Sequence, residues 1–207
     1  MPRKSGIVFV LAGTVLLMSA LSLFLYNRYE DARAGQEAES LLDEVQTLLE
    51  TVPSAIPEET APSETLNPEL PVVQINGCGY IGYLSIPKLE LELPVISEWS
   101  YTRLKTAPCR QFGSSRTDDL VIAAHNYKKH FGLLSKLQEG DGVVFTDMDG
   151  IENRYEVAAV DTLAPTEVEA VQNSGHDLVL YTCTYGGSTR VTVFCDRSGG
   201  SITDDVT

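Results

Sequence analysis

The stretch "LVLYTCTYGGSTRVTVFCDR", residues 178–197, consists of two apolar runs joined by a short connection that contains two glycines. Runs of this composition are typical of paired β-strands, and Gly186 and Gly187 can adopt the positive φ that a tight connection needs. Such a hairpin places Cys183 and Arg190 roughly opposite each other at one end, with Cβ atoms about 4.5–5.5 Å apart. Packing explains the apolar residues here, but it does not explain an arginine that faces a thiol.

Similar short runs, separated by turn residues, continue through the C-terminal two thirds of the chain. Together with the two strands of the hairpin, at 178–183 and 190–196, they predict strands at 80–86, 89–95, 119–125, 142–147 and 153–163. Two further stretches, 130–138 and 165–172, predict short helices of about two turns. We expect a mainly β fold, a closed antiparallel or mixed β-barrel of about seven to eight strands, because closure removes exposed sheet edges.

The N-terminus carries an apolar segment of 21 uncharged residues, Gly6 to Tyr26. About 20 apolar residues in a helix cross the hydrocarbon core of a bilayer, whereas the apolar region of a cleaved signal peptide is only about 7–15 residues long. A retained transmembrane helix over 6–26 is therefore favoured over a cleaved signal. Arg3 and Lys4 precede it, and positive residues favour the cytoplasmic side, so residues 1–5 are expected inside and the rest of the chain outside.

The segment that follows, 27–71, is acidic and rich in proline, with eleven Asp and Glu against two Arg. Leucine and valine spacing within it predicts a short helix over 36–50. The rest of this segment is predicted to form a semi-rigid, extracellular stalk that would hold the next domain on the order of tens of ångströms from the membrane. The β-rich domain is predicted over 72–198, and residues 199–207 are expected to form a flexible tail.

Composition excludes some functions. The net charge of −14, without clustered Lys and Arg, argues against a nucleic-acid partner. No two of the four cysteines show CxxC spacing, and with three scattered histidines no metal site is predicted. Cys195 shares a strand face with Val191 and Val193, opposite to Arg190, so a packing role is favoured. Whether Cys78 and Cys109 form a disulfide stays open.

Cys183 is the candidate nucleophile. A neighbouring guanidinium could favour the thiolate and hold the oxyanion that forms when a thiolate attacks a carbonyl. On these residues alone, a small buried thiol beside a solvated arginine explains the pattern equally well. A nucleophilic thiol also needs an acid/base partner. Of the three histidines, His125 is favoured because it ends a buried strand, whereas His130 follows two lysines in a polar loop and His176 lies in a turn.

The order of these features resembles the sortases, the cysteine transpeptidases of Gram-positive cell surfaces. The resemblance covers residues 79–197 and depends on "YLSIPKLELELPV", on "IAAHN" with His125, and on "LVLYTC" with Cys183 followed by Arg190. Val179 stands where the family usually has threonine, and Ala124 where glycine is common, but neither departure removes a reacting group. The class is unresolved: 164–177 is shorter than the helical insertion of class B, and neither a lid nor a second membrane span typical of class C is evident.

The resemblance implies a mechanism and partners. Cys183 would form a thioester with a secreted protein that bears an LPxTG-like sorting signal, His125 would transfer protons, and Arg190 would stabilise the oxyanion. Thr182, Ala124 and Asn126 would contact the substrate, although a residue chosen only for its β-propensity explains Thr182 equally well. The acceptor would be an amine of a peptidoglycan precursor or of another, pilin-like surface protein. No cofactor is required, and calcium dependence is not settled.

Two other functions fit part of the pattern. A hydrolytic cysteine peptidase would use the same three residues with water as the acceptor. A non-catalytic, membrane-anchored β-domain is disfavoured by the presence of all three reactive residues in the family's order. In each case the expected location is the cell membrane, with a single span, the N-terminus in the cytoplasm and the C-terminal domain outside.

Overall fold

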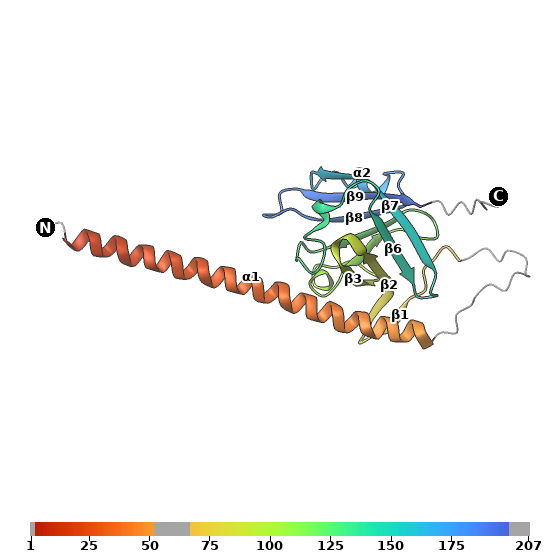
Figure 1. Ribbon diagram of the computed structural model, residues 1–207, viewed down its shortest axis with the longest axis horizontal. Coiled ribbons are helices and arrows are strands. Elements are labelled where there is room, and N and C mark those ends of the chain that lie inside the picture. Colours follow the sequence, from red (N-terminus) through yellow and green to blue (C-terminus); the bar gives the residue numbers. More distant parts are fainter. Residues whose placement is uncertain (1–2, 52–66, 199–207) are drawn as a thin grey trace, which may run out of the picture.

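The structure is a computed structural model that describes residues 3–51 and 67–198. Most of the predicted proline-rich spacer, at 52–66, and the predicted tail, at 199–207, lie outside the described residues. The described chain forms one long helix and a β-barrel beside its C-terminal half (Figure 1).

The barrel is built from strands that pair in the order β1-β2-β3-β4-β5-β8-β9-β7-β6, and β6 pairs back with β2. Eight strands thus close the barrel, and β1 extends it at the edge of β2. The pairs β3–β4 and β5–β8 are parallel and the others antiparallel, which confirms the predicted closed, mixed barrel. The described strands are β1 (Val73–Ile75), β2 (Cys78–Ile86), β3 (Leu91–Ile96), β4 (Cys109–Phe112), β5 (Leu120–Ala124), β6 (Gly142–Asp147), β7 (Glu152–Leu163), β8 (Leu178–Cys183) and β9 (Arg190–Arg197).

Two of these strands were not predicted. The strand β1 has only three residues, and β4, with the sequence "CRQF", has neither the apolar alternation nor the β-branched residues that mark a strand. The predicted strand at 89–95 begins later, because residues Pro87–Leu89 form the 3₁₀ helix η1 and Glu90 follows in the left-handed region at φ 53°. The two short helices predicted at 130–138 and 165–172 are shorter in the structure, where they are η3 (Leu134–Lys136) and α2 (Val168–Gln172). A further short helix, η2 (Arg103–Lys105), lies outside both predicted ranges.

The strand β5 is buried on both of its faces. All five of its residues are buried, as the continuous apolar run predicted. Leu120 and Ile122 face the barrel core, whereas Val121 and Ala123 pack under loops on the outer face. Cys195 is fully buried in the core, which confirms its predicted packing role. A strand packed on both faces fixes the residue at its end.

The long helix α1 (Arg3–Thr51) is continuous, with 49 residues and a length of about 74 Å at 1.5 Å per residue. The helix predicted over 36–50 is its C-terminal part, and the connecting residues 27–35 are helical as well. It is the one helix among the described residues that is long and apolar enough to cross a membrane. The residues from Ile7 to Tyr26 are exposed, except for Gly13, which is partly exposed.

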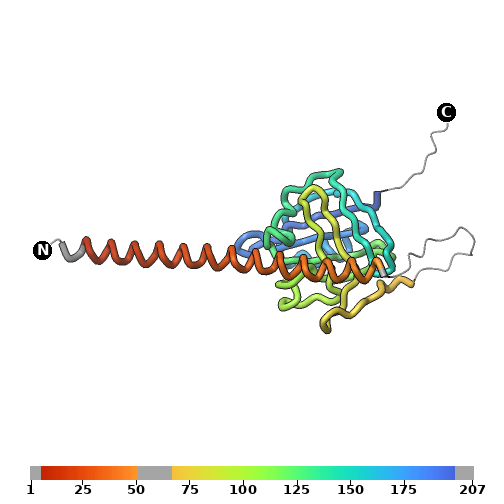
Figure 2. The backbone as a smooth tube through the Cα atoms, turned by 60° about the horizontal axis from the view of Figure 1, so that its bottom comes forward, coloured from red at the N-terminus to blue at the C-terminus, as the bar shows by residue number. Residues whose placement is uncertain are grey.

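The second half of α1 packs against the barrel (Figure 2). Its buried side chains recur at helical spacing, as Ala34, Ala38, Leu42 and Val45. Val45 packs in one cluster with residues of β1, β2 and β3. Contact with the domain begins at Asp31, five residues or about 8 Å beyond Tyr26 along the helix, so residues 27–51 lie along the domain and do not act as a free spacer.

Candidate active site

The register of three adjacent strands aligns the predicted catalytic residues. Ala124 of β5 pairs with Thr182 of β8, so the next residue on each strand places His125 beside Cys183. Cys183 in turn pairs directly with Arg190 of β9. Neighbouring strands lie about 4.8 Å apart, so an imidazole, a thiol and a guanidinium form one row at the ends of β5, β8 and β9.

The side chain of Cys183 lies on the outer face of the barrel. Successive residues of β8 alternate faces, so Leu178, Leu180 and Thr182 face the core and the side chain of Cys183 lies on the opposite face. Cys183 is half-buried, and all four cysteines are free thiols. The strand thus holds the Cys183 thiol in place without enclosing it.

A pocket of about 250 Å³ lies over this row. His125, Cys183 and Arg190 line it together. Two segments supply its walls, one before β4 and one between β7 and β8, and their side chains are largely apolar. The wall residues include Trp99, Tyr101, Leu104, Leu163, Val168 and Val171. An open, largely apolar groove that is lined by the three reactive groups suits an extended peptide with apolar side chains.

Burial lowers the pKa of His125 below its usual value of 6.5, and the positive charge of Lys105 lowers that pKa further. The ring is therefore neutral at neutral pH. When His125 does carry a proton, the depressed pKa makes the imidazolium a stronger acid, which suits donation to a departing amine.

The guanidinium of Arg190 is fixed by the connection between β8 and β9. Its Nη1 donates to the carbonyls of Gly187, at 3.1 Å, and Thr189, at 3.0 Å. Gly186 and Gly187 adopt positive φ, 87° and 76°, as their place in the sequence predicted. A guanidinium has five N–H donors, so donors remain for a substrate oxygen.

Of the predicted substrate-binding residues, Ala124 lines the pocket. Thr182 and Asn126 are not among its lining residues in the described part of the chain. The buried hydroxyl of Thr182 instead donates to the carbonyl of Ala124 at 2.8 Å. This bond ties β8 to β5 one residue before the catalytic row.

The pocket floor contains two residues that sequence reasoning missed. The hydroxyl of Tyr181 donates to the side-chain oxygen of Gln111, and burial raises the pKa of Tyr181 to about 12. The only sequence signal for Tyr181 was its position two residues before Cys183, on the same strand face. Gln111 lies on the unpredicted strand β4. Trp99 is 37% exposed and contacts the Tyr101 ring at 4.8 Å at the pocket wall.

The other two histidines lie elsewhere. His130 is fully buried, so the polar loop expected around it is only partly exposed, and burial lowers its pKa to about 4. His176 contacts Asp196 at 2.7 Å, near the opposite end of β8. Among the described residues, no group of three or more His, Cys, Asp or Glu side chains could hold a metal ion.

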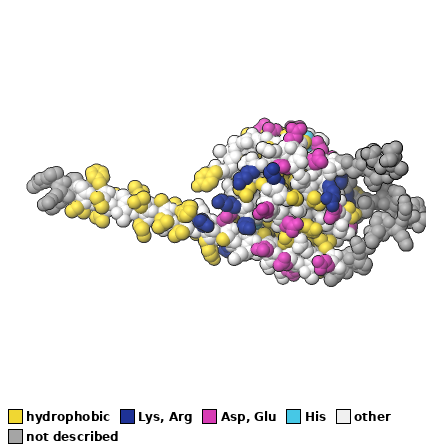
Figure 3. Space-filling view, viewed as in Figure 1, with side chains coloured by type: hydrophobic (Ala, Val, Ile, Leu, Met, Phe, Trp, Pro, Cys, Tyr) yellow, Lys and Arg dark blue, Asp and Glu magenta, His cyan; other side chains and the backbone are white. Residues whose placement is uncertain are grey.

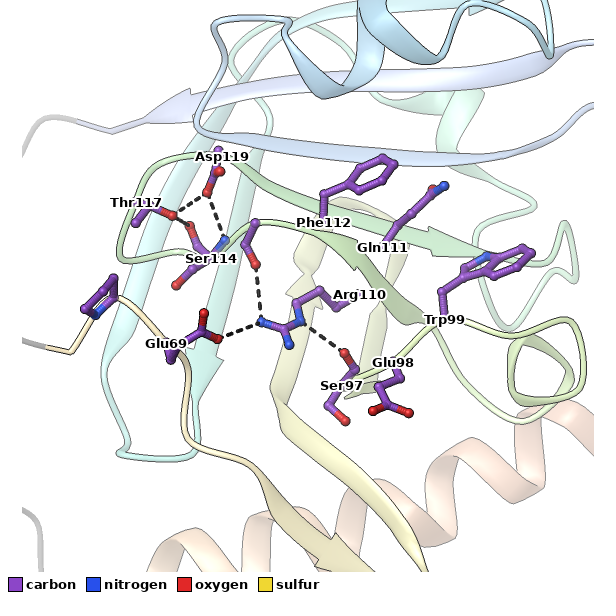
Figure 4. Close-up of a pocket in the computed structure, with 12 residues that line it drawn as sticks. Glu69, Ser97, Glu98, Trp99, Arg110, Gln111, Phe112, Ser114, Thr117 and Asp119 are labelled. Carbon is purple, nitrogen blue, oxygen red and sulfur yellow. Dashed lines mark hydrogen bonds and ion pairs between the residues drawn. The ribbon is translucent and has the colours of Figure 1, made fainter.

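A second, more polar pocket of about 580 Å³ adjoins the first and shares Trp99, Gln111 and Phe112 with it (Figure 4). Arg110 crosses this pocket and donates to the carbonyls of Ser97, at 3.0 Å, and Gly113, at 3.4 Å. These bonds fasten the loops on either side of β4. They hold the wall of the catalytic pocket in place.

A closed, mixed barrel with a cysteine, a histidine and an arginine in one row at its mouth defines a narrow class of cysteine-containing β-barrel proteins. The family model described as Sortase domain matches residues 84–198, more than half of the chain. The chain therefore belongs to the sortase family, as the resemblance predicted.

Individual relatives agree with this assignment. Sortase A of Bacillus anthracis is 30% identical over 109 residues, which cover 50% of this chain and 51% of that protein, so the chain matches about half the length of this curated relative. Sortase C1 from Streptococcus agalactiae is 28% identical with a TM-score of 0.53, over 61% of this chain and 72% of that one. Sortase C from Streptococcus pneumoniae is 26% identical with a TM-score of 0.53, over 83% and 95%.

Proposed function

We propose that this chain is a membrane-anchored cysteine transpeptidase of the sortase type. It cleaves a C-terminal, LPxTG-like sorting signal of a secreted protein and transfers the acyl group to an amine. The observation that carries the proposal is the row of His125, Cys183 and Arg190, which together line an open, largely apolar groove.

In the first half-reaction, the Cys183 thiolate attacks the carbonyl carbon of the residue before the scissile bond, usually threonine. The carbonyl oxygen becomes an oxyanion, and the Arg190 guanidinium stabilises it. When the intermediate collapses, the C–N bond breaks and the departing amine takes a proton from the His125 imidazolium. The products are a thioester on Cys183, a free C-terminal fragment and a neutral His125.

In the second half-reaction, an acceptor amine attacks the thioester carbonyl. His125 removes the proton from that amine, a second oxyanion forms beside Arg190, and the C–S bond breaks. The new amide leaves, and the Cys183 thiolate and the His125 imidazolium are restored. The neutral ring favoured by burial of His125 is the form that accepts this proton.

The acceptor in this proposal is an amine of a peptidoglycan precursor or of a pilin-like surface protein. The Streptococcus pneumoniae relative is described in connection with pilin substrate specificity, which supports a protein acceptor of that kind. Residues 6–26 would span the cell membrane with residues 1–5 in the cytoplasm. The catalytic domain, 72–198, would lie outside, joined to the span through 27–71.

The test is mass spectrometry of the full chain incubated with sorting-signal peptides and a panel of amines. Wild type is expected to gain the acyl mass on Cys183, and Cys183→Ala is expected to gain none. His125→Ala and Arg190→Ala are expected to lower turnover by a factor of about 100 or more. Wild-type turnover in either would contradict the assigned roles.

Two controls complete the experiment. Cys78→Ala removes a half-buried thiol outside the catalytic row and is expected to leave the adduct on Cys183 intact. Comparing products with and without amine separates transfer from hydrolysis. An amide-linked product in preference to free acid supports the transpeptidase, and free acid alone in the presence of amine supports a hydrolytic peptidase.

A further inference from the structure

The catalytic end of the barrel faces the same way as the apolar end of α1. The strands β5 and β8 are parallel and both end at the catalytic row. The connection between β8 and β9 projects toward the side from which the N-terminal half of α1 extends (Figure 1). The mouth of the site is thus on the side of the barrel nearest to the predicted membrane span.

The loop after His125, residues 126–130, is fixed to α1 just beyond that span. The backbone N–H of Lys128 donates to the Asp31 carboxylate at 2.6 Å. The side-chain stem of Lys129 lies over Gly35, so closely that a Cβ at Gly35 would be 2.8 Å from Lys129 Cγ. These two contacts hold the loop against the helix.

The height of this loop above the bilayer follows from the helix rise. Asp31 is five residues beyond Tyr26, or about 8 Å along the axis. The headgroup layer on each side of the hydrocarbon core is about 5–8 Å thick, and a helix tilt of about 20° lowers the loop further. The loop 126–130 is therefore level with the outer edge of the headgroups.

The side chains at this end suit a lipid surface. Lys128 and Lys129 are exposed, and neither ammonium has an ion pair among the described residues, although the chain as a whole carries −14. Lysine and arginine side chains gather where the helix meets the domain (Figure 3). Tyr185, in the projecting connection, is 95% exposed. Tyrosine is enriched at membrane–water interfaces, and a lysine close to an anionic lipid surface is attracted to it.

We propose that Lys128, Lys129 and Tyr185 form a membrane-docking surface that holds the mouth of the catalytic pocket against the headgroup layer of the bilayer spanned by α1. The ligand is the phosphate of anionic lipids for the two lysines and the headgroup boundary for the tyrosine ring. The inference depends on residues 6–26 spanning the bilayer but not on the chemistry of Cys183.

The test uses the full chain in nanodiscs, with anionic phosphatidylglycerol or with zwitterionic phosphatidylcholine alone. Trp99 is the single tryptophan, so its energy transfer to a dansyl headgroup lipid reports the distance of the domain from the surface. Hydrogen exchange reports contact at 126–130 and 184–189. We expect transfer and protection to be greatest in anionic discs. Each basic charge near an anionic surface favours contact by about fivefold.

Substitutions in the docking surface, with α1 left unchanged, separate the contribution of that surface from the contribution of the helix. Lys128→Glu and Tyr185→Ser are expected to remove protection of both loops, and Tyr185→Phe is expected to retain it. Arg154→Glu changes the charge equally at an exposed site near the opposite end of β9, and should behave as wild type. Unchanged protection in Lys128→Glu and Tyr185→Ser, or equal protection in both lipids, would overturn the proposal. Each measurement is repeated in Cys183→Ala, which lacks the proposed nucleophile. The result on membrane contact is then independent of the proposed reaction.

Discussion

At the scale of single residues, the lowered pKa of His125 has two causes that can be separated. Burial is the larger, and the ammonium of Lys105 adds to it. Lys105→Gln removes a positive charge that disfavours a second one nearby, so the pKa of His125 is expected to rise toward 6.5. Proton NMR titration of the His125 ring measures this directly. Lys136→Gln, another exposed lysine, serves as control, and an unchanged His125 titration in Lys105→Gln would contradict the coupling.

Two buried threonines offer a contrast in hydrogen bonding. Thr182 donates to the Ala124 carbonyl, whereas the Thr192 hydroxyl has no partner among the described residues. Thr182→Val removes this buried hydrogen bond and is expected to lower the free energy of unfolding by about 0.5–1.5 kcal/mol. Thr192→Val removes an unpaired group and is expected to be neutral or stabilising. Denaturant unfolding of both variants measures the difference, and equal losses would refute this assignment.

The convergence of His125, Cys183 and Arg190 could be predicted from sequence, because strand ends and strand pairing leave periodic signals, whereas their catalytic roles stay a prediction. The role of Thr182 could not be predicted, since a threonine in a strand looks the same whether its hydroxyl meets a substrate or a neighbouring carbonyl. Gln111 was missed for a related reason. Its contact with Tyr181 depends on the pairing of β4, and four residues of mixed polarity give no strand signal.

At the scale of elements, the contact between α1 and the loop 126–132 encloses a titratable group. His130 is fully buried there, next to Ala34 of the helix, and burial lowers its pKa to about 4. In the unfolded chain its pKa is about 6.5, so the unfolded state binds more protons between these values. The free energy of unfolding is therefore expected to fall by about 3 kcal/mol as the pH falls from 6.5 to 4.

The measurement is thermal or denaturant unfolding across that pH range, in wild type and in His130→Gln. Glutamine does not titrate, so the variant is expected to lose this part of the pH dependence, whatever its stability at pH 7. His176→Gln, at a more exposed histidine, provides the control. A variant with the same slope as wild type would show that His130 does not cause it.

The elements with strong periodicity were predicted well, and the ones that were mispredicted depend on tertiary contact. The apolar run of β5 indicated a doubly buried strand because both of its faces are covered. The helical segment at 36–50 was correct in type, but its spacing could not show that residues 27–35 continue the helix. Glu30, Asp31 and Arg33 are polar enough to resemble a solvated stalk, and ion pairs of Arg33 with Glu30 and Glu37 support the helix locally.

At the scale of the whole molecule, the long helix α1 and the barrel pack against each other. The amphipathic half of α1 buries Ala38 in the main core and Val45 in the cluster around β1 to β3. An apolar stripe in a sequence indicates that a partner exists but does not identify it. Only the structure shows that the partner is the barrel of the same chain, and that the anchor helix contacts the loop after His125.

A single substitution is expected to disrupt the packing of α1 against the barrel. Val45 is fully buried, and Val45→Asp would place an unpaired carboxylate in an apolar cluster, at a cost of several kcal/mol. We expect the C-terminal half of α1 to leave the barrel and to become less stable as a helix, because most helical stability in proteins comes from packing of the amphipathic face. Hydrogen exchange should then rise at 34–50 and at 126–132. Thr47→Asp adds the same charge on the exposed face and should exchange as wild type. Wild-type protection in Val45→Asp would mean that the helix is held mainly by other contacts, and the height of the site above the membrane would then depend on those contacts instead.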